Sequence, residues 1–258
     1  MTDFVQPGTP IREAADVPTA IAARLAEIRG ILFDKDGVLL DYEGTFGPQN
    51  RAVVKLASGG DPALAERLMV ECGYAPGVSR AAAGSLFAAG SLDEIADAMV
   101  ATVAPDDPAA LRRRILDAFN QAPGRSVLTP SCRETLATLA DGGYTLGIAT
   151  NDSEQSMRAT LAPHDVLTHF AFTAGYDSGY GAKPAPGMAL AFFEATGLAP
   201  REVMFVGDNV HDLDCGAAAK CGLTVGVLSG TGAAEDLTPR ADLLIDDIGV
   251  LPGLLAPR

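Results

Sequence analysis

The stretch ILFDKDGVLLD, residues 31–41, decides which fold the sequence predicts. Its first three residues form a short apolar run that is typical of a buried strand. Asp34 and Asp36 follow this run directly, and Gly37 comes next. Carboxylates at the end of a buried strand are costly unless something pairs with them. The stretch therefore indicates either a capped turn or two carboxylates that hold a cation and carry out chemistry.

Composition and charge exclude several classes of protein. The chain has 258 residues, 48% of them hydrophobic, which is enough to bury a sizeable core. Its net charge of −14 argues against a nucleic-acid-binding protein, which usually has a basic face, and against a polybasic membrane surface. No apolar run approaches the roughly 20 residues that a membrane span needs. We therefore expect neither nucleic acid nor membrane as a partner.

The N-terminus and the cysteines bear on the compartment. Residues 1–18 are polar and lack the apolar segment of a signal peptide. The four cysteines contain no C-x-x-C pair, which favours free thiols in a reducing compartment. These features predict a cytoplasmic protein.

The pattern of apolar residues divides the chain into two parts. Residues 47–124 are Ala-rich with helical spacing, and Asp61 and Asp107, each followed by proline, predict N-caps of helices. The rest of the chain contains short apolar runs separated by helical segments. These runs are 31–33, 144–150, 170–174, 203–208, 223–228 and 242–246.

Strands that alternate with helices predict a parallel sheet covered on both faces. We therefore expect an α/β fold with a Rossmann-like core, formed by residues 1–46 and 125–258. A helical domain, residues 47–124, is inserted after the first strand.

Polar residues follow several of the predicted strands. Ligands of open α/β sheets bind outside the carboxyl ends of the strands, so these residues are expected to meet at one site. Taken singly, each has a common structural explanation, such as a turn, a helix cap or a solvated charge. Their order along the chain indicates a shared function. The residues are Asp34, Asp36, Thr150, Asn151, Lys183, Asp208 and Asp212.

These residues carry a resemblance to a known family. The segment FDKDG, residues 33–37, is similar to the D-x-D-G motif of the haloacid dehalogenase superfamily of phosphohydrolases. Thr150, Lys183 and the segment GDNVHD, residues 207–212, resemble the second, third and fourth motifs of that family. The match covers the core, and the helical insertion resembles the family's cap domain in position. Members similar to phosphoglycolate phosphatase have the nearest layout.

The resemblance implies a phosphatase that acts on a small phosphorylated metabolite similar to phosphoglycolate. Asp34 would be the nucleophile and would form an aspartyl-phosphate. Asp36 would protonate the leaving group and later activate the attacking water. Thr150, Asn151 and Lys183 would bind the phosphoryl group.

The resemblance also implies a Mg²⁺ cofactor, which takes oxygen ligands and few carboxylates. Asp34, Asp208 and the backbone carbonyl of Asp36 would hold this ion. Asp212 would orient a water molecule or Lys183.

Two further basic side chains have different expected surroundings. Arg80, in the helical insertion, could meet a carboxylate of the substrate. Lys35 lies between the two carboxylates of the first motif, and extended geometry directs its side chain away from them. We expect the side chain of Lys35 to be solvated or to face the cap.

Two alternatives to a phosphatase remain open. A sugar phosphomutase resembles it in all four motifs and returns the phosphoryl group to a substrate. A non-catalytic phospholigand-binding or regulatory protein could use the same fold, although degenerate members typically lack one of the motif residues. Asp36 argues against a dehalogenase or a phosphonatase, because those members lack an acid at this position. Either a monomer or a homodimer fits the sequence.

Overall fold

The structure, a computed structural model, describes residues 9–78, 80–120 and 125–256. The chain divides into two compact units. Unit 1 comprises residues 1–41 and 128–258, and unit 2 comprises residues 42–127. Within the described residues, none of the helices combines the length and the apolar character that crossing a membrane requires.

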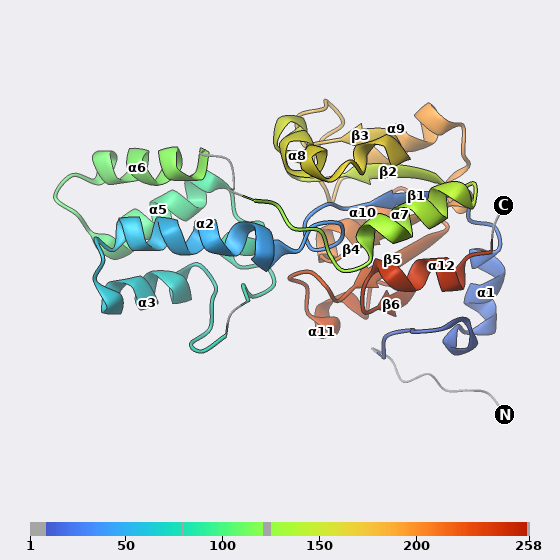
Figure 1. Ribbon diagram of the computed structural model, residues 1–258, viewed down its shortest axis with the longest axis horizontal. Coiled ribbons are helices and arrows are strands. Elements are labelled where there is room, and N and C mark those ends of the chain that lie inside the picture. The colour runs from blue at the N-terminus through green and yellow to red at the C-terminus, as the bar shows by residue number, and fades with distance from the viewer. Residues whose placement is uncertain (1–8, 79, 121–124, 257–258) are drawn as a thin grey trace. The chain divides into compact units, whose positions relative to one another are not determined.

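Unit 1 is built on a six-stranded sheet with the strand order β3-β2-β1-β4-β5-β6 (Figure 1). Neighbouring strands pair in parallel throughout. The strands are β1 Gly30–Phe33, β2 Thr145–Ala149, β3 Phe170–Ala174, β4 Val203–Gly207, β5 Leu223–Val227 and β6 Leu243–Ile245. Each strand overlaps one of the apolar runs found in the sequence, so the expected α/β fold is confirmed.

Helices and 3-10 turns connect these strands. The α-helices of unit 1 are α1 Thr19–Leu25, α7 Cys132–Asp141, α8 Glu154–Leu161, α9 Gly187–Thr196, α10 Val210–Ala218, α11 Ala234–Leu237 and α12 Leu251–Leu254. The 3-10 turns are η1 Ala14–Asp16, η2 Ala162–His164, η3 Leu167–His169, η4 Pro200–Glu202 and η5 Ile248–Val250.

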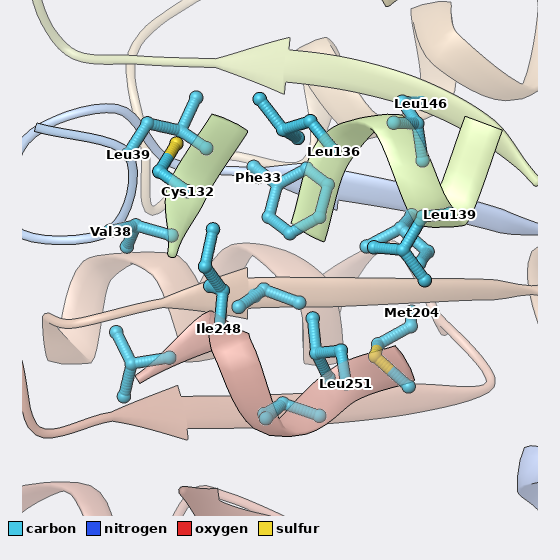
Figure 2. Packing of buried hydrophobic residues seen from close by; sticks show 14 of the residues in the cluster. Phe33, Val38, Leu39, Cys132, Leu136, Leu139, Leu146, Met204, Ile248 and Leu251 are labelled. Atoms are coloured by element: carbon cyan, nitrogen blue, oxygen red, sulfur yellow. The ribbon is translucent and has the colours of Figure 1, made fainter. Parts of the chain in front are cut away.

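Successive residues of β1 point to opposite faces of the sheet, and each face has its own core. Phe33 belongs to the cluster that contains Leu136 of α7 and Leu251 of α12 (Figure 2). Leu32 belongs to a separate cluster with Phe192 of α9. All of these side chains are fully buried. The apolar run at the start of the deciding stretch is therefore buried on both sides, as a central parallel strand requires.

Unit 2 is helical, with a core of its own. Its helices are α2 Tyr42–Ala57, α3 Pro62–Glu71, α4 Leu86–Ala89, α5 Leu92–Val103 and α6 Pro108–Asn120. Leu68, Met99 and Ile115 are fully buried in this core. The predicted N-caps are confirmed, because the Asp61 side chain accepts hydrogen bonds at the start of α3 and the Asp107 side chain accepts one at the start of α6.

One helix boundary was wrong in the sequence-based prediction. The helical pattern in the sequence was expected to begin at residue 47, whereas α2 begins at Tyr42 and contains Pro48. Unit 2 correspondingly begins at residue 42. Glu43, in the first turn, accepts hydrogen bonds from the backbone N–H of Ala81 and the hydroxyl of Tyr74. Both partners are distant in the sequence. Tertiary contacts therefore stabilise the first turn of α2, which local helix propensity does not favour.

Candidate active site

Three neighbouring strands bring their polar residues to one edge of the sheet. Phe33, the last residue of β1, is in register with Ile148 of β2 and Val206 of β4. Each of these strands is followed directly by a polar residue, namely Asp34, Thr150 and Asp208. Because the strands are parallel and adjacent, their carboxyl ends lie side by side. The convergence that the sequence predicted is therefore present in unit 1.

A buried lysine joins two of the carboxylates. The ammonium of Lys183 lies 2.5 Å from Oδ1 of Asp34 and 2.6 Å from Oδ1 of Asp212. It also donates to the backbone carbonyl of Ala149 over 2.9 Å. Burial alone would lower the pKa of Lys183, but Asp212 and Asp34 outweigh that effect and raise it. Lys183 therefore stays protonated, and its ammonium contacts a carboxylate oxygen of Asp34, the expected nucleophile.

Three carboxylates form a cluster that could hold a cation. One oxygen from each of Asp34, Asp208 and Asp212 lies within 4.8 Å of the others, and all three residues are buried. Burial raises the pKa of Asp208 well above its usual value, and Asp212 and Asp34 raise it further. The three carboxylates and the Lys183 ammonium together carry a net charge of −2 when all four groups are ionised. Oxygen donors with this charge fit a hard divalent cation.

The carboxylate of Asp208 is fixed by the loop after β5. Its Oδ2 accepts hydrogen bonds from the backbone N–H of Thr231 over 2.6 Å and from the Thr231 hydroxyl over 3.3 Å. Gly230 packs so closely on this carboxylate that an added Cβ would overlap with it. Both features fix the orientation of the Asp208 carboxylate within the cluster.

The first motif turns sharply after β1. Gly37 has φ +81°, and an L side chain there would be strained and would meet Asp208. The Lys35 carbonyl accepts hydrogen bonds from the backbone N–H groups of Leu39 and Leu40, each over 2.9 Å. The chain therefore leaves extended geometry immediately after Asp34.

This turn overturns the expectation for Lys35. Its side chain is fully buried, and its ammonium lies 2.8 Å from Oδ1 of Asp36 and 2.9 Å from Oδ2 of Asp152. The expected solvated or cap-facing side chain is wrong, because the alternation of strand side chains does not extend into the turn. Burial raises the pKa of Asp36 to about 6, although Lys35 opposes that rise.

Comparison with known proteins agrees with this geometry. A family model described as haloacid dehalogenase-like hydrolase matches residues 28–220. The chain belongs to the haloacid dehalogenase-like hydrolases. A phosphoglycolate phosphatase of Escherichia coli (strain K12) is 27% identical over 256 residues, which cover 91% of this chain and 96% of that protein. The expected family and the hydrolase class are thus confirmed, and the curated relative is a phosphatase.

Solved structures share the fold of this haloacid dehalogenase-like hydrolase. A predicted phosphoglycolate phosphatase from Haemophilus somnus has a TM-score of 0.66 at 21% identity, covering 87% of this chain and 96% of that one. A protein from Thermotoga maritima assigned as a β-phosphoglucomutase has a TM-score of 0.67 at 19% identity, covering 87% and 97%. At these identities the likeness concerns the fold.

In this hydrolase Asn151 follows Thr150 at the end of β2 and contacts the backbone of Lys183. Its amide nitrogen donates to the backbone carbonyl of Lys183 over 3.0 Å, and its amide oxygen accepts from the Lys183 backbone N–H over 2.8 Å. Asn151 therefore fixes the backbone of Lys183, and its contact with a phosphoryl group stays a prediction. Arg80 is exposed and belongs to unit 2, and its contact with a substrate stays a prediction.

Sequence reasoning missed two polar residues of the site, Asp152 and Thr231. Asp152 follows Thr150 and Asn151 so closely that it could have been read as part of the second motif. Thr231 lies in the segment SGTG, residues 229–232, directly after a predicted strand. Two glycines at a strand end signal a close approach of backbone to a site, which was the available clue.

Gly230→Ala is expected to weaken binding of a divalent cation about 10–100-fold, the usual effect of disturbing a group that orients a metal ligand. The added methyl group would displace the Asp208 carboxylate. Calorimetric titration with Mg²⁺ measures the affinity directly, without turnover. Gly253→Ala is the matched control, because a Cβ there would meet no atom within 4 Å. Unchanged affinity in Gly230→Ala would show that Asp208 is not a cation ligand.

Proposed function

We propose that the protein is a Mg²⁺-dependent phosphatase that hydrolyses a small phosphorylated metabolite similar to phosphoglycolate, through an aspartyl-phosphate on Asp34. The observation that carries the proposal is the position of Asp34. It lies at the end of the central strand, in contact with the Lys183 ammonium, and Asp36 follows two residues later. A nucleophile, a cation and a second acid are the groups that phosphoryl transfer to a carboxylate requires.

The proposed reaction has two steps. In the first, a carboxylate oxygen of Asp34 bonds to phosphorus while the ester oxygen departs with a proton from Asp36. In the second, Asp36 takes a proton from water, the water oxygen bonds to phosphorus, and the bond to Asp34 breaks. Inorganic phosphate leaves, and both carboxyl groups return to their starting states.

Two buried residues support the phosphoryl group in this proposal. Lys183 would neutralise charge on its oxygens as that charge develops. Thr150 is almost fully buried, and its hydroxyl oxygen accepts a hydrogen bond from the Asp152 backbone N–H over 3.1 Å. This bond occupies the oxygen and leaves the hydroxyl proton to donate to the phosphoryl group.

The residues present fit a magnesium ion. Asp34, Asp208 and the backbone carbonyl of Asp36 would hold it, and Asp212 would orient the groups around them. A bound Mg²⁺ would offset the repulsion between the Asp34 carboxylate and a dianionic phosphate ester. The excess negative charge of the acidic cluster supports this assignment.

The curated relatives support the choice of substrate. Proteins named phosphoglycolate phosphatase align with 91% of the chain. The presence of every expected motif residue argues against a non-catalytic binding protein. A sugar phosphomutase would use the same groups. It would yield an isomerised sugar phosphate, so product analysis distinguishes it from a phosphatase.

A phosphate-release screen over small phosphorylated metabolites, with and without Mg²⁺, tests the proposal. We expect phosphoglycolate or a similar phosphorylated acid to be hydrolysed fastest. EDTA should lower the rate about 10²-fold or more, because a catalytic metal contributes several kcal/mol of charge stabilisation. Excess Mg²⁺ should restore it.

Three outcomes would contradict parts of this proposal. Undiminished turnover in metal-free buffer would exclude the metal assignment. An isomerised sugar phosphate without free phosphate would identify a mutase. Binding of phosphorylated ligands without any turnover would identify a binding protein.

A further inference from the structure

Lys35 is a buried cation that the proposed reaction does not use. Its side chain has no exposed surface, although a charged ammonium is costly to bury without partners. Asp36 and Asp152 supply those partners at 2.8 Å and 2.9 Å. The arrangement repeats the pattern of Lys183, which joins Asp34 to Asp212. Each acid of the first motif is thus held by a buried lysine that a second carboxylate shares.

The ion pair with Lys35 makes the two carboxylate oxygens of Asp36 different from each other. The ammonium donates to Oδ1 of Asp36. The proton that Asp36 would exchange with the leaving group or with water must then move through Oδ2. The backbone on both sides is fixed as well, because Lys35 accepts from Leu40 and Gly37 donates to Leu40 over 2.8 Å.

Asp152 in turn is oriented by the start of α8. Its Oδ1 accepts a hydrogen bond from the backbone N–H of Ser153 over 2.8 Å, which leaves Oδ2 for Lys35. Its backbone N–H contacts the hydroxyl oxygen of Thr150. A continuous set of contacts therefore runs from the loop after β2, through Lys35, to the carboxylate of Asp36.

We propose that Lys35 and Asp152 are positioning residues that hold the Asp36 carboxylate in the orientation needed for proton transfer. The kinetic part of this inference rests on the proposed phosphatase reaction. Neither residue contacts the reacting atoms in this scheme, and both act through Asp36.

A double-mutant cycle between Lys35→Met and Asp36→Asn tests the proposal. We expect Lys35→Met alone to lower kcat for an alkyl phosphate about 10²-fold, the usual effect of misplacing a catalytic group. KM should change by less than about threefold, since the substrate does not contact Lys35. In the Asp36→Asn background the same substitution should cost less than about threefold, because the group it positions is already gone.

The leaving group supplies a second signature. With p-nitrophenyl phosphate, which departs without a proton, the first step should be spared in Lys35→Met as in Asp36→Asn. Lys55→Met, at an exposed lysine of α2, is the matched control and should leave kcat unchanged. If Lys35→Met does not fold, Asp152→Asn tests the proposal in its place. The Asp152 side chain is 26% exposed, and its substitution leaves Lys35 paired with Asp36. It should show the same leaving-group dependence with a smaller loss.

A crystal structure of Lys35→Met, or of Asp152→Asn if needed, separates this inference from the proposed activity. The Asp36 side chain should occupy more than one rotamer, whereas Asp34 should remain on Lys183. An ordered, unmoved Asp36 would overturn the inference, as would additive losses in the cycle or a raised KM with unchanged kcat. Absence of phosphatase activity in the wild-type protein would instead refute the proposed function.

Discussion

Asp34→Asn is expected to give a folded protein that releases no phosphate above background. An amide is a poor nucleophile and a poorer cation ligand, so both roles proposed for Asp34 are lost. Removal of a nucleophile typically costs on the order of 10⁴–10⁶ in kcat. The asparagine side chain retains an oxygen that can accept from Lys183, so the buried contact is kept in part.

Phosphate release and thermal unfolding, measured on the same preparation, separate catalysis from folding. Asp141→Asn, at an exposed residue at the end of α7, is the matched control and should retain full activity. Acid-quenched wild-type protein should carry a phosphate mass during turnover, and Asp34→Asn should carry none. Ordinary turnover by Asp34→Asn would mean that another group, or water, attacks phosphorus directly.

Asp36→Asn is expected to separate the two steps of the reaction. With p-nitrophenyl phosphate the leaving group needs little protonation, so the first step should be nearly normal. The aspartyl-phosphate still needs an activated water, which asparagine cannot provide. The phosphoryl group should therefore accumulate on Asp34, and rapid mixing should show a burst of about one nitrophenol per active site before slow turnover.

The choice of substrate provides the control for this result. An alkyl phosphate has a poor leaving group, so both steps should slow about 10²–10⁴-fold and no burst should appear. The phosphate mass on the quenched protein should be removed by hydroxylamine, as expected for an acyl phosphate. Wild-type rates on both substrates would show that Asp36 is only a turn residue or a cation ligand.

The sequence alone determined the α/β fold of unit 1. Each strand coincides with a short apolar run. The helical segments between the runs indicate that the strands are parallel. Asp61 and Asp107 marked helix starts because capping depends on neighbouring residues only. The polar residues after β1, β2 and β4 could be assigned to one site because the carboxyl ends of parallel strands share an edge.

Only the tertiary structure decided the partners of the buried charges. The turn at Gly37 directs Lys35 inward to Asp36, against the alternation that an extended strand would impose. Asn151 holds the backbone of Lys183, 32 residues away. Lys183 itself contacts Asp34 across 149 residues of sequence. Local propensity and periodicity report on residues within a few positions of each other, whereas a buried charge is stabilised by whichever groups the folded chain places around it.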